Sequence, residues 1–564
     1  MMNADELKPQ SMWNADLGNG RFQNPILYAD YSDPDAIRVG DDYFMIASSF
    51  CNAPALPVLH SKDLVNWKVV NYVCDRIPVA RYAHPVHGCG VWAPAIRYHE
   101  GIFYVCFPMP DEGIYMSTTK DPFGEWSKPV NIRPGAGWID PCPFWDEDGR
   151  AYLVAGVARS RIGYKSVLHM VEMQPDGMGL IGEEVRIFDG NLNDQVTIEG
   201  PKMYKRNGYY YIFAPAGGVK VGWQTVLRSK NVFGPYEYKV VMRQGDSAVN
   251  GPHQGAWVDT QTGQDWFIHF QDVYAAGRIT HLQPMSWEND WPMIGIAKNG
   301  NDYGEPVMEY EKPDIGEAAR AKLQEAFGEK TVFEPATSDE FEGDELGMQW
   351  QWSANYESGW YGFSGTGEER HLHLSAVSKS EDRKLSDVKS LLLQKWPAPE
   401  FSCVTKMDMS NLMKGDMAGI VSLGMHYAGI GVLRESGKYT FKVIEGTQHF
   451  DKERAIAEQH EEIIHTVGKT ELLNAAGKAM VWFLYKVERT GTKELNAEEK
   501  NVPVEKITMS YSLNGTDFVE AISFEAVAGR WVGVKNGVFC THDKAPMAST
   551  NKGFASVYYV KYFR

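Results

Sequence analysis

The chain has 564 residues, which is more than one hydrophobic core usually holds, so we expect at least two domains. Its formal net charge of −17 argues against nucleic acid or an anionic membrane as a partner, because both attract Lys and Arg. The charge suits a neutral substrate, and solubility alone explains it equally well. No segment is long and apolar enough to cross a bilayer.

Composition favours an all-β chain. The 54 glycines, 29 prolines and 12% aromatic residues are typical of many short strands and turns. The seven cysteines form no CxxC pair and are odd in number, so neither a disulfide framework nor a zinc site is indicated. The N-terminus shows no signal peptide, which leaves a cytoplasmic chain or an exported one whose signal has been removed.

One short pattern occurs five times in the first 300 residues. Its first copy, DPDAIRVGDDYF at 33–44, holds an acidic residue, a proline, an apolar strand, a turn and an aromatic return strand. The copies anchor at Pro34, Pro94, Pro141, Pro201 and Gly255. Five all-β units of roughly 50 residues predict a five-bladed β-propeller, which we assign to residues 1–310.

Three copies begin with a carboxylate: Asp33, Asp140 and Glu199. The first strand of each blade starts near the propeller axis, so these side chains should meet in the central funnel. Their pKa values must then separate, because three neighbouring acids do not ionise independently. Hydrolysis of a glycosidic bond needs one carboxylate base and one carboxylic acid. Turn-capping acids or a non-catalytic binding propeller are the alternatives.

The five-fold pattern ends before residue 311. Residues 311–337 are predicted to be a linker, with a short helix at 314–327 (DIGEAARAKLQEAF). Residues 338–564 alternate short strand-like runs with polar loops and predict a β-sandwich of jelly-roll type. The charged stretch 451–465 is predicted to be an exposed loop or an extended edge strand.

Together these residues resemble glycoside hydrolase family 43. The matching stretches are NPIL at 24–27, DPD at 33–35, VWAP at 91–94, WIDP at 138–141, IEGP at 198–201, GR at 277–278, LQP at 282–284 and WP at 291–292. The resemblance implies an inverting five-bladed propeller enzyme. In it Asp33 is the general base, Asp140 raises the pKa of the acid and orients it, and Glu199 is the general acid.

The resemblance also implies substrate-binding residues. Trp92 matches an aromatic sugar platform, and Arg278 matches an arginine on the funnel floor. His253 could contact the substrate or an axial metal such as calcium, although a lone histidine is more often structural. Phe50 and Ala53 lie in the loop FCNAPA at 50–55, where related xylosidases carry more aromatic residues. A roomier pocket there would accept both xylose and arabinose.

The C-terminal domain resembles the concanavalin-like sandwich of exo-acting members, in SDEF at 338–341, LLLQK at 391–395, PAPEF at 397–401 and GDMAG at 415–419. A loop of that domain narrows the funnel in relatives, and YESGWYGF at 356–363 is one candidate for it, ordinary packing the other. Some such sandwiches hold a structural calcium, but Lys561 stands where an Asp is frequent.

The leading hypothesis is an exo-acting inverting glycosidase that releases xylose or arabinose from hemicellulose oligosaccharides and requires no cofactor. An arabinanase of the same fold is the alternative within the class. A carbohydrate-binding propeller without catalysis is the alternative from another class. That second alternative predicts the loss of a carboxylate, and none of the three is missing.

Overall fold

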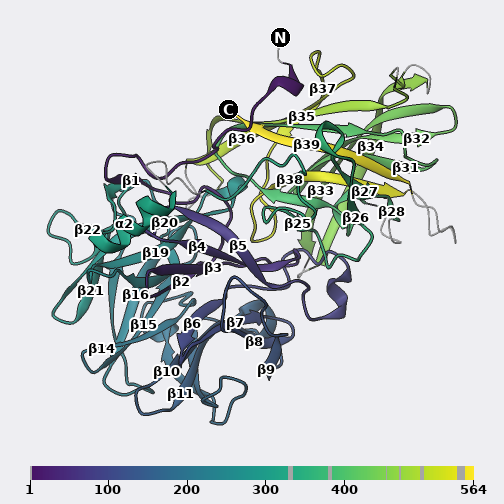
Figure 1. The fold of residues 1–564 in the computed structure, drawn as a ribbon. Coiled ribbons are helices and arrows are strands. Elements are labelled where there is room, and N and C mark those ends of the chain that lie inside the picture. Colours follow the sequence, from purple (N-terminus) through teal and green to yellow (C-terminus); the bar gives the residue numbers. More distant parts are fainter. Residues whose placement is uncertain are drawn as a thin grey trace.

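The computed structural model describes residues 3–327, 334–378, 384–451, 454–468, 472–474, 476–495, 501–542 and 553–564. Strands dominate these residues and form two bodies, a ring of small sheets drawn in purple to teal and a two-layered body in green and yellow (Figure 1). The predicted all-β class, the five-bladed propeller and the C-terminal sandwich are confirmed. No helix in the described ranges has the length and apolar character needed to cross a bilayer.

Each blade contains four antiparallel strands that follow one another in the chain, and β23 (Gly304–Glu305) and β22 (Ile296–Ala297) extend the sheet of blade 4. Blades 1 and 2 comprise β2 (Asp35–Val39), β3 (Asp42–Ile46), β4 (Ala55–Ser61), β5 (Trp67–Cys74), then β6 (Ala95–His99), β7 (Ile102–Met109), β8 (Gly113–Thr119) and β9 (Val130–Pro134). Blades 3 to 5 comprise β10 (Trp138–Trp145), β11 (Ala151–Val157), β12 (Val167–Met173), β13 (Val185–Asp189), β14 (Lys202–Arg206), β15 (Tyr209–Ala216), β16 (Trp223–Ser229), β17 (Glu237–Met242), β18 (His253–Asp259), β19 (Asp265–Asp272), β20 (Arg278–Glu288) and β21 (Trp291–Ile294). First strands of neighbouring blades contact one another, β18 with β2 and β2 with β6, so they surround the axis.

Two of the blade hairpins are closed by two-residue turns in which both residues have positive φ. Glu100 and Gly101 connect β6 to β7 with φ values of 47° and 82°. Asn207 and Gly208 connect β14 to β15 with φ values of 51° and 75°. Two successive positive φ values define the type I′ turn, which matches the twist of paired strands.

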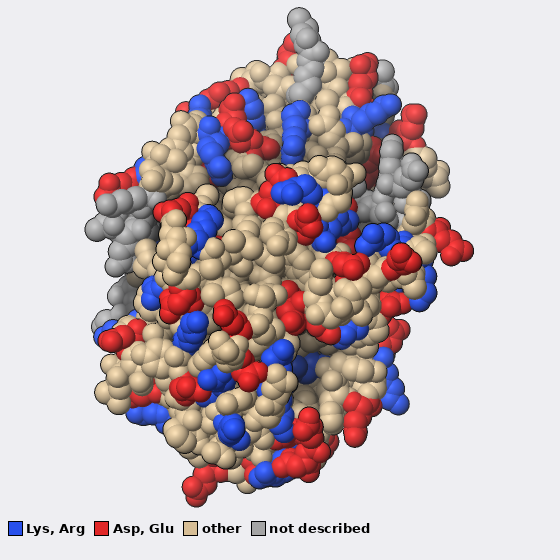
Figure 2. Space-filling model, turned by 90° about the vertical axis from the view of Figure 1, so that its left-hand side faces the viewer, with Lys and Arg blue, Asp and Glu red and all other residues tan. Residues whose placement is uncertain are grey.

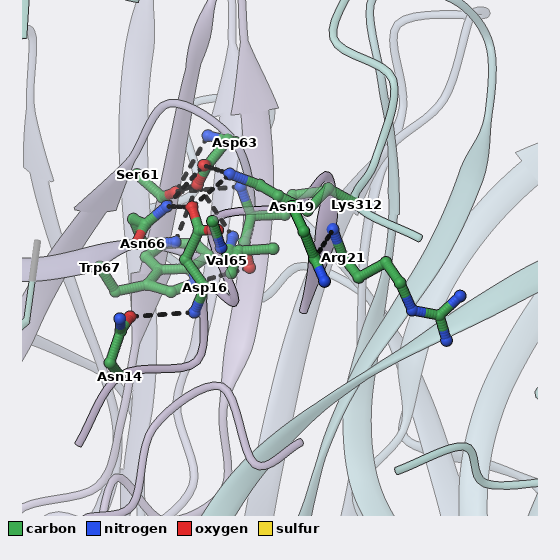
Figure 3. A network of polar contacts seen from close by, with 12 residues as sticks. Asn14, Asp16, Asn19, Arg21, Ser61, Asp63, Val65, Asn66, Trp67 and Lys312 are labelled. Carbon is green, nitrogen blue, oxygen red and sulfur yellow. Dashed lines mark hydrogen bonds and ion pairs between the residues drawn. The ribbon is translucent and has the colours of Figure 1, made fainter. Parts of the chain in front are cut away.

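The ring closes between blade 5 and blade 1 through the N-terminal arm. Strand β1 (Arg21–Gln23) pairs with β24 (Glu309–Glu311), which follows the last blade. Lys312 Nζ then lies 2.6 Å from Asp16 Oδ2 and 2.9 Å from Asp63 Oδ2 (Figure 3). Asp63 belongs to the turn between β4 and β5 of blade 1. One ion-pair network therefore joins the N-terminal arm, blade 1 and the segment around β24 that follows blade 5.

The helix expected at 314–327 is confirmed as α2 (Glu317–Phe327). Its Lys322 Nζ lies 2.7 Å from Asp41 Oδ2 in the first hairpin of blade 1. The other short elements are η1 (Ala4–Glu6), η2 (Ala80–Ala83), α1 (Arg159–Ile162), η3 (Gly190–Leu192), η4 (Tyr274–Ala276), η5 (Gly367–Glu369), η6 (Leu385–Asp387), β22 (Ile296–Ala297) and β23 (Gly304–Glu305).

The sandwich consists of two large sheets that pack face to face around one apolar core. The first contains β25 (Gln351–Trp352), β28 (Val377–Ser378), β29 (Leu392–Lys395), β31 (Asp416–Leu423), β32 (His426–Glu435), β33 (Lys438–Asp451), β34 (Arg454–Gly468) and β38 (Lys535–His542). The second contains β26 (Tyr361–Ser364), β27 (His371–Ser375), β30 (Phe401–Asp408), β35 (Met480–Lys493), β36 (Val502–Ser512), β37 (Val519–Glu525) and β39 (Phe554–Phe563). Strand β34 lies at a sheet edge, so of the two predictions for 451–465 the extended edge strand is correct; residues 452–453 lie outside the described ranges.

Both chain ends lie on the sandwich (Figure 1). Ala4 N donates to Gly515 O at 2.9 Å, and Asp5 forms an ion pair with Lys406 at 2.9 Å. At the other end, Arg564 N donates to Gln10 Oε1 at 3.1 Å. The start of the chain, which we assigned to the propeller, therefore packs against the second domain.

Charged residues of both signs alternate over the face seen in Figure 2. Ion pairs such as Arg206–Asp290 and Arg228–Glu237 join charges of opposite sign on the propeller blades. The face in Figure 2 carries no continuous basic patch of the kind that a polyanion would need.

Candidate active site

A left-handed residue directly precedes four of the five repeat anchors. Asp33, Asp140, Gly200 and Gln254 have φ values of 56°, 55°, 60° and 42°. A non-glycine residue in this region costs about 1–2 kcal/mol, so the surrounding blades must hold it there. The kink interrupts the first strand where it reaches the axis: the β10 ladder shifts register between Ile139 and Cys142. The repeated sequence thus produces the same left-handed backbone kink at the axial start of four blades.

Asp33 is buried and held by three donors. Arg278 Nη1 donates to its Oδ1 at 2.8 Å. Ser32 Oγ and Ser48 Oγ donate to its Oδ2 at 2.7 and 2.6 Å. A carboxylate has about four acceptor positions, so one remains, on Oδ1 beside the guanidinium. Asp33 can therefore accept one further hydrogen bond, such as one from a water molecule in the funnel.

Asp140 is buried in blade 3 and bonded to blade 4. Gly200 N donates to Asp140 Oδ2 at 2.8 Å, so this carboxylate touches the backbone directly after Glu199. Burial raises the pKa of Asp140 to about 6, and the negative charge of Asp33 contributes to the rise. The buried Lys202 ammonium and the Gly200 N–H act in the opposite direction.

Glu199 is the carboxyl group that stays protonated at neutral pH. Burial raises its pKa to about 8, with a second contribution from the charge of Asp140; Arg278 opposes both. Its side chain keeps 26% of its surface exposed, so it can still reach a ligand in the funnel. Gly156 of β11 lies against it: a Cβ there would sit 3.5 Å from Glu199 Cα.

His253 and Arg278 complete the floor of the funnel. Burial, aided by the positive charge of Arg278, lowers the pKa of His253 to about 3, so the imidazole is neutral. Its Nε2 lies 3.5 Å from Glu199 Oε1. The structure therefore brings five of the eight sequence-predicted site residues together: the three acids, Arg278 and His253.

Trp92 forms a side wall on blade 2. Its Nε1 donates to Gly88 O at 3.1 Å, and Arg161 lies over its ring at 5.1 Å from the centroid. Phe50 lies behind it, with ring centroids 6.2 Å apart and only 4% of its own surface exposed. The indole is thus held in place by its hydrogen bond and by neighbouring side chains, and Trp92 remains half-buried.

Ala53 lies elsewhere. It is completely buried at the domain interface, where its N–H donates to Trp352 O at 3.1 Å and its carbonyl accepts from Trp352 N at 2.6 Å. It leaves no surface for a ligand, so it cannot widen the pocket by direct contact. The backbone at Ala53, next to Pro54, faces the sandwich, and the sequence pattern did not indicate this direction.

The sandwich loop that reaches the funnel is 528–534, not 356–363. Trp531, 44% exposed at a φ of 65°, places its ring 6.5 Å from that of Trp92. Tyr356 instead donates to Asp75 beside blade 1, and Trp360 is buried in the sandwich core. Trp531 was not among the residues predicted from the sequence; the glycines at 529 and 533 around an aromatic residue are the one signal that could have found it.

Asp30 fastens this loop to the funnel floor. Its Oδ2 accepts from Gly533 N and its Oδ1 from Arg278 N, both at 2.9 Å, and the residue is buried. Val534 N donates to Ala275 O at 2.7 Å beside it. The position of Arg278 thus depends directly on the docking of the sandwich.

Near the ends of the sandwich, where a calcium was considered from sequence, Lys561 Nζ lies 2.9 Å from Glu340 Oε1, so this carboxylate already has a cationic partner. No group of three metal-ligating side chains occurs among the described residues.

Known proteins match almost the whole length of this chain. The family model for glycosyl hydrolases family 43 matches residues 22–292, and that for the beta xylosidase C-terminal Concanavalin A-like domain matches 338–562. A putative beta-xylosidase of Xylanibacter ruminicola is 35% identical, over 93% of this chain and 87% of that protein. A non-reducing end alpha-L-arabinofuranosidase of Bacteroides ovatus is 33% identical over 50% of this chain and 55% of its own length. The crystal structure of a xylan beta-1,4-xylosidase of Bacillus halodurans has a TM-score of 0.75 at 23% identity, over 96% of this chain and 100% of that one, and shows the shared fold.

Proposed function

Because the chain belongs to glycosyl hydrolase family 43, we propose that it removes terminal β-D-xylose or α-L-arabinofuranose from hemicellulose oligosaccharides, with inversion at the anomeric carbon. The observation that carries this proposal is the unequal set of carboxyl groups. Asp33 is paired with a guanidinium, whereas the pKa of Glu199 is raised to about 8. A base and an acid therefore coexist at neutral pH, as glycoside hydrolysis requires.

In the proposed mechanism Asp33 activates water. The free acceptor position on Oδ1 takes a hydrogen bond from the water, and the carboxylate receives its proton as the oxygen attacks the anomeric carbon. Arg278 keeps Asp33 oriented through the 2.8 Å contact. We expect the Asp33 and Glu199 carboxyl groups to lie roughly 6.5–9.5 Å apart, the spacing that leaves room for that water.

Glu199 donates its proton to the glycosidic oxygen as the bond breaks. Asp140 keeps this proton in place through its negative charge and fixes the backbone after Glu199 through Gly200. Both proton transfers use side chains of this chain, so we expect no cofactor in the reaction.

The wall residues favour an exo mode. Trp92 offers a flat ring for the terminal sugar, and Trp531 narrows the mouth from the opposite domain. A pocket closed on one side accepts a chain end better than a chain interior, so the arabinanase alternative is less favoured in its endo form. Relatives named for xylose and for arabinose both match, which supports both sugars as substrates, although the match to the putative beta-xylosidase covers 93% of this chain and that to the alpha-L-arabinofuranosidase covers 50%.

Hydrolysis of nitrophenyl β-D-xyloside and α-L-arabinofuranoside tests this proposal. We expect release of nitrophenol from at least one, and proton NMR should show the inverted anomer first. Glu199→Ala should suppress hydrolysis of xylobiose far more than hydrolysis of the activated aryl glycoside, because only the poor leaving group needs an acid. Glu184→Ala, an exposed glutamate of the neighbouring blade, is the matched control. Silence on both aryl glycosides would favour a binding propeller, and a retained anomer would exclude the single displacement.

A further inference from the structure

A second cavity, of about 640 Å³, lies between blades 4 and 5 and the sandwich. Its propeller wall comes from the loops around Lys220, Asn250 and Asp272, and its sandwich wall from Arg489 and residues 501–503. None of the three funnel carboxylates lines it. Ligand sites typically occupy about 300–1,000 Å³ and often lie at domain interfaces, so the size and the place both suit a ligand.

The charged groups of this cavity have opposite partners. Lys220 Nζ lies 2.7 Å from Asp272 Oδ1. Arg489 Nη2 lies 3.3 Å from Glu505 Oε1 and donates to Tyr28 OH at 3.0 Å. Breaking such a pair to bind an ion would leave a partly buried charge uncompensated. A neutral ligand leaves these pairs intact.

The remaining lining combines aromatic rings with amides and hydroxyls. Trp13 Nε1 donates to Pro25 O at 2.8 Å, and its ring packs on Tyr28 with centroids 5.1 Å apart, so the indole is rigidly placed. Gln271 Nε2 donates to Asn250 Oδ1 at 2.7 Å, which orders both amides before a ligand arrives. Fixed rings and oriented amides match a ligand with apolar faces and many hydroxyl groups.

A single turn of the backbone, between β19 and β20, separates this cavity from the funnel. Asp272 lines the cavity, and its β-ladder partner is Arg278 on the funnel floor. Tyr274, at a φ of 64°, continues the same turn and also lines the cavity. A chain segment held here would therefore be kept close to the funnel, which raises the effective concentration of its end.

We propose that this interdomain cavity is a second carbohydrate site, which holds a neutral oligosaccharide segment apart from the sugar that is cleaved. The choice of a pentose oligosaccharide as the ligand rests on the proposed function. The evidence from the cavity, its aromatic rings and its paired charges is independent of that function. The site makes the sandwich a participant in binding of polymeric substrate.

Titration calorimetry on the full chain carrying Glu199→Gln tests the proposal, with xylohexaose and arabinohexaose as probes. We expect two binding sites per chain for at least one probe. Ala248→Trp places a bulky ring at the exposed rim of the cavity, and Tyr274→Asn removes a lining ring while keeping a residue type that adopts positive φ. Each should weaken one site at least tenfold, whereas Ala318→Trp on the surface of α2 should weaken neither.

A single site for both probes would overturn the proposal, and so would two sites that neither cavity variant weakens. These outcomes are separate from a failure of the proposed function, which would appear as absent hydrolysis of aryl glycosides by the chain with Glu199 intact. Two variants are used so that misfolding of one, detected by its thermal melt, leaves the other as the test.

Discussion

Replacing Asp140 by Asn should lower the pH at which activity is lost on the alkaline side. In the unmodified chain, kcat/KM for xylobiose should fall as pH rises through about 8, where Glu199 loses its proton. Asn keeps an oxygen for the Gly200 N–H at 2.8 Å but removes the negative charge that favours protonated Glu199. The Glu199 pKa should therefore fall.

The size of this change follows from Coulomb's law. Asp140 and Glu199 are joined through one backbone amide, so their carboxyl groups lie on the order of 7 Å apart; with an effective dielectric constant of about 20, the repulsion is about 2.4 kcal/mol, or about 1.7 pH units. We expect the alkaline limb to move from near pH 8 to roughly 6–6.5, and kcat/KM at pH 7.5 to fall with the protonated fraction of Glu199.

The assay is the pH dependence of kcat/KM for xylobiose, because this quantity reports the free enzyme and a leaving group that needs an acid. Asp176→Asn, an exposed carboxylate in a turn of the same blade, is the matched control and should leave the profile unchanged. An alkaline limb that stays near pH 8 in the Asp140 variant would refute the assignment of Asp140 as the group that holds the Glu199 proton.

Three further predictions concern the domain interface and the ring. Trp531→Ala should raise KM for nitrophenyl β-xyloside about tenfold with little change in melting temperature, since the indole is 44% exposed; Leu513→Ala on the sandwich surface is the control. Asp30→Ala leaves two buried N–H groups without an acceptor and should cost about 2–6 kcal/mol in urea unfolding. Lys312→Met leaves two largely buried carboxylates without their ammonium partner and should cost about 3–5 kcal/mol at pH 7.

The Lys312 prediction has a pH dependence with a definite sign. Burial by itself would raise the pKa of Asp16. The hydrogen bonds that Asp16 accepts from Lys312 and other donors lower its pKa by more than burial raises it, so the net pKa is lowered. That lowered pKa stabilises the fold above the ordinary pKa of Asp, and the benefit is lost as pH falls through the lowered value. The cost of Lys312→Met should therefore shrink at pH 4, and an equal cost at both pH values would contradict the network. An unchanged KM for nitrophenyl β-xyloside would contradict the prediction for Trp531→Ala. An unchanged midpoint of urea unfolding would contradict the prediction for Asp30→Ala.

The repeat pattern was enough to predict the propeller, because its signals are local: a proline after three of the four kinks, and a Glu-Gly or Asn-Gly turn in two of the hairpins. Asp33, Asp140 and Glu199 could be found for the same reason, since each lies one or two residues before the anchor of its repeat. Trp531 and Asp30 could not be found that way. They meet the funnel through contacts between residues about 500 positions apart, such as Asp30 with Gly533, and no periodic signal marks such a contact.

Ala53 shows a second limit of sequence reasoning. It follows the first hairpin and lies in the connection between β3 and β4 of blade 1. Whether it faced the funnel or the sandwich depended on the direction of a short irregular segment and on pairing with Trp352, about 300 residues away. A pattern of period two cannot assign a face where the strand is interrupted.

Because the first and last described segments both lie on the sandwich, the propeller is topologically an insertion between an N-terminal arm and the body of the second domain. Cutting the chain at the linker would not release a free propeller, since Ala4 and Asp5 would still hold it to Gly515 and Lys406. A truncated chain that stops at the linker would also expose the buried Met12. The sandwich would therefore separate from the propeller only together with this N-terminal arm, and a single cut between the domains would not divide them.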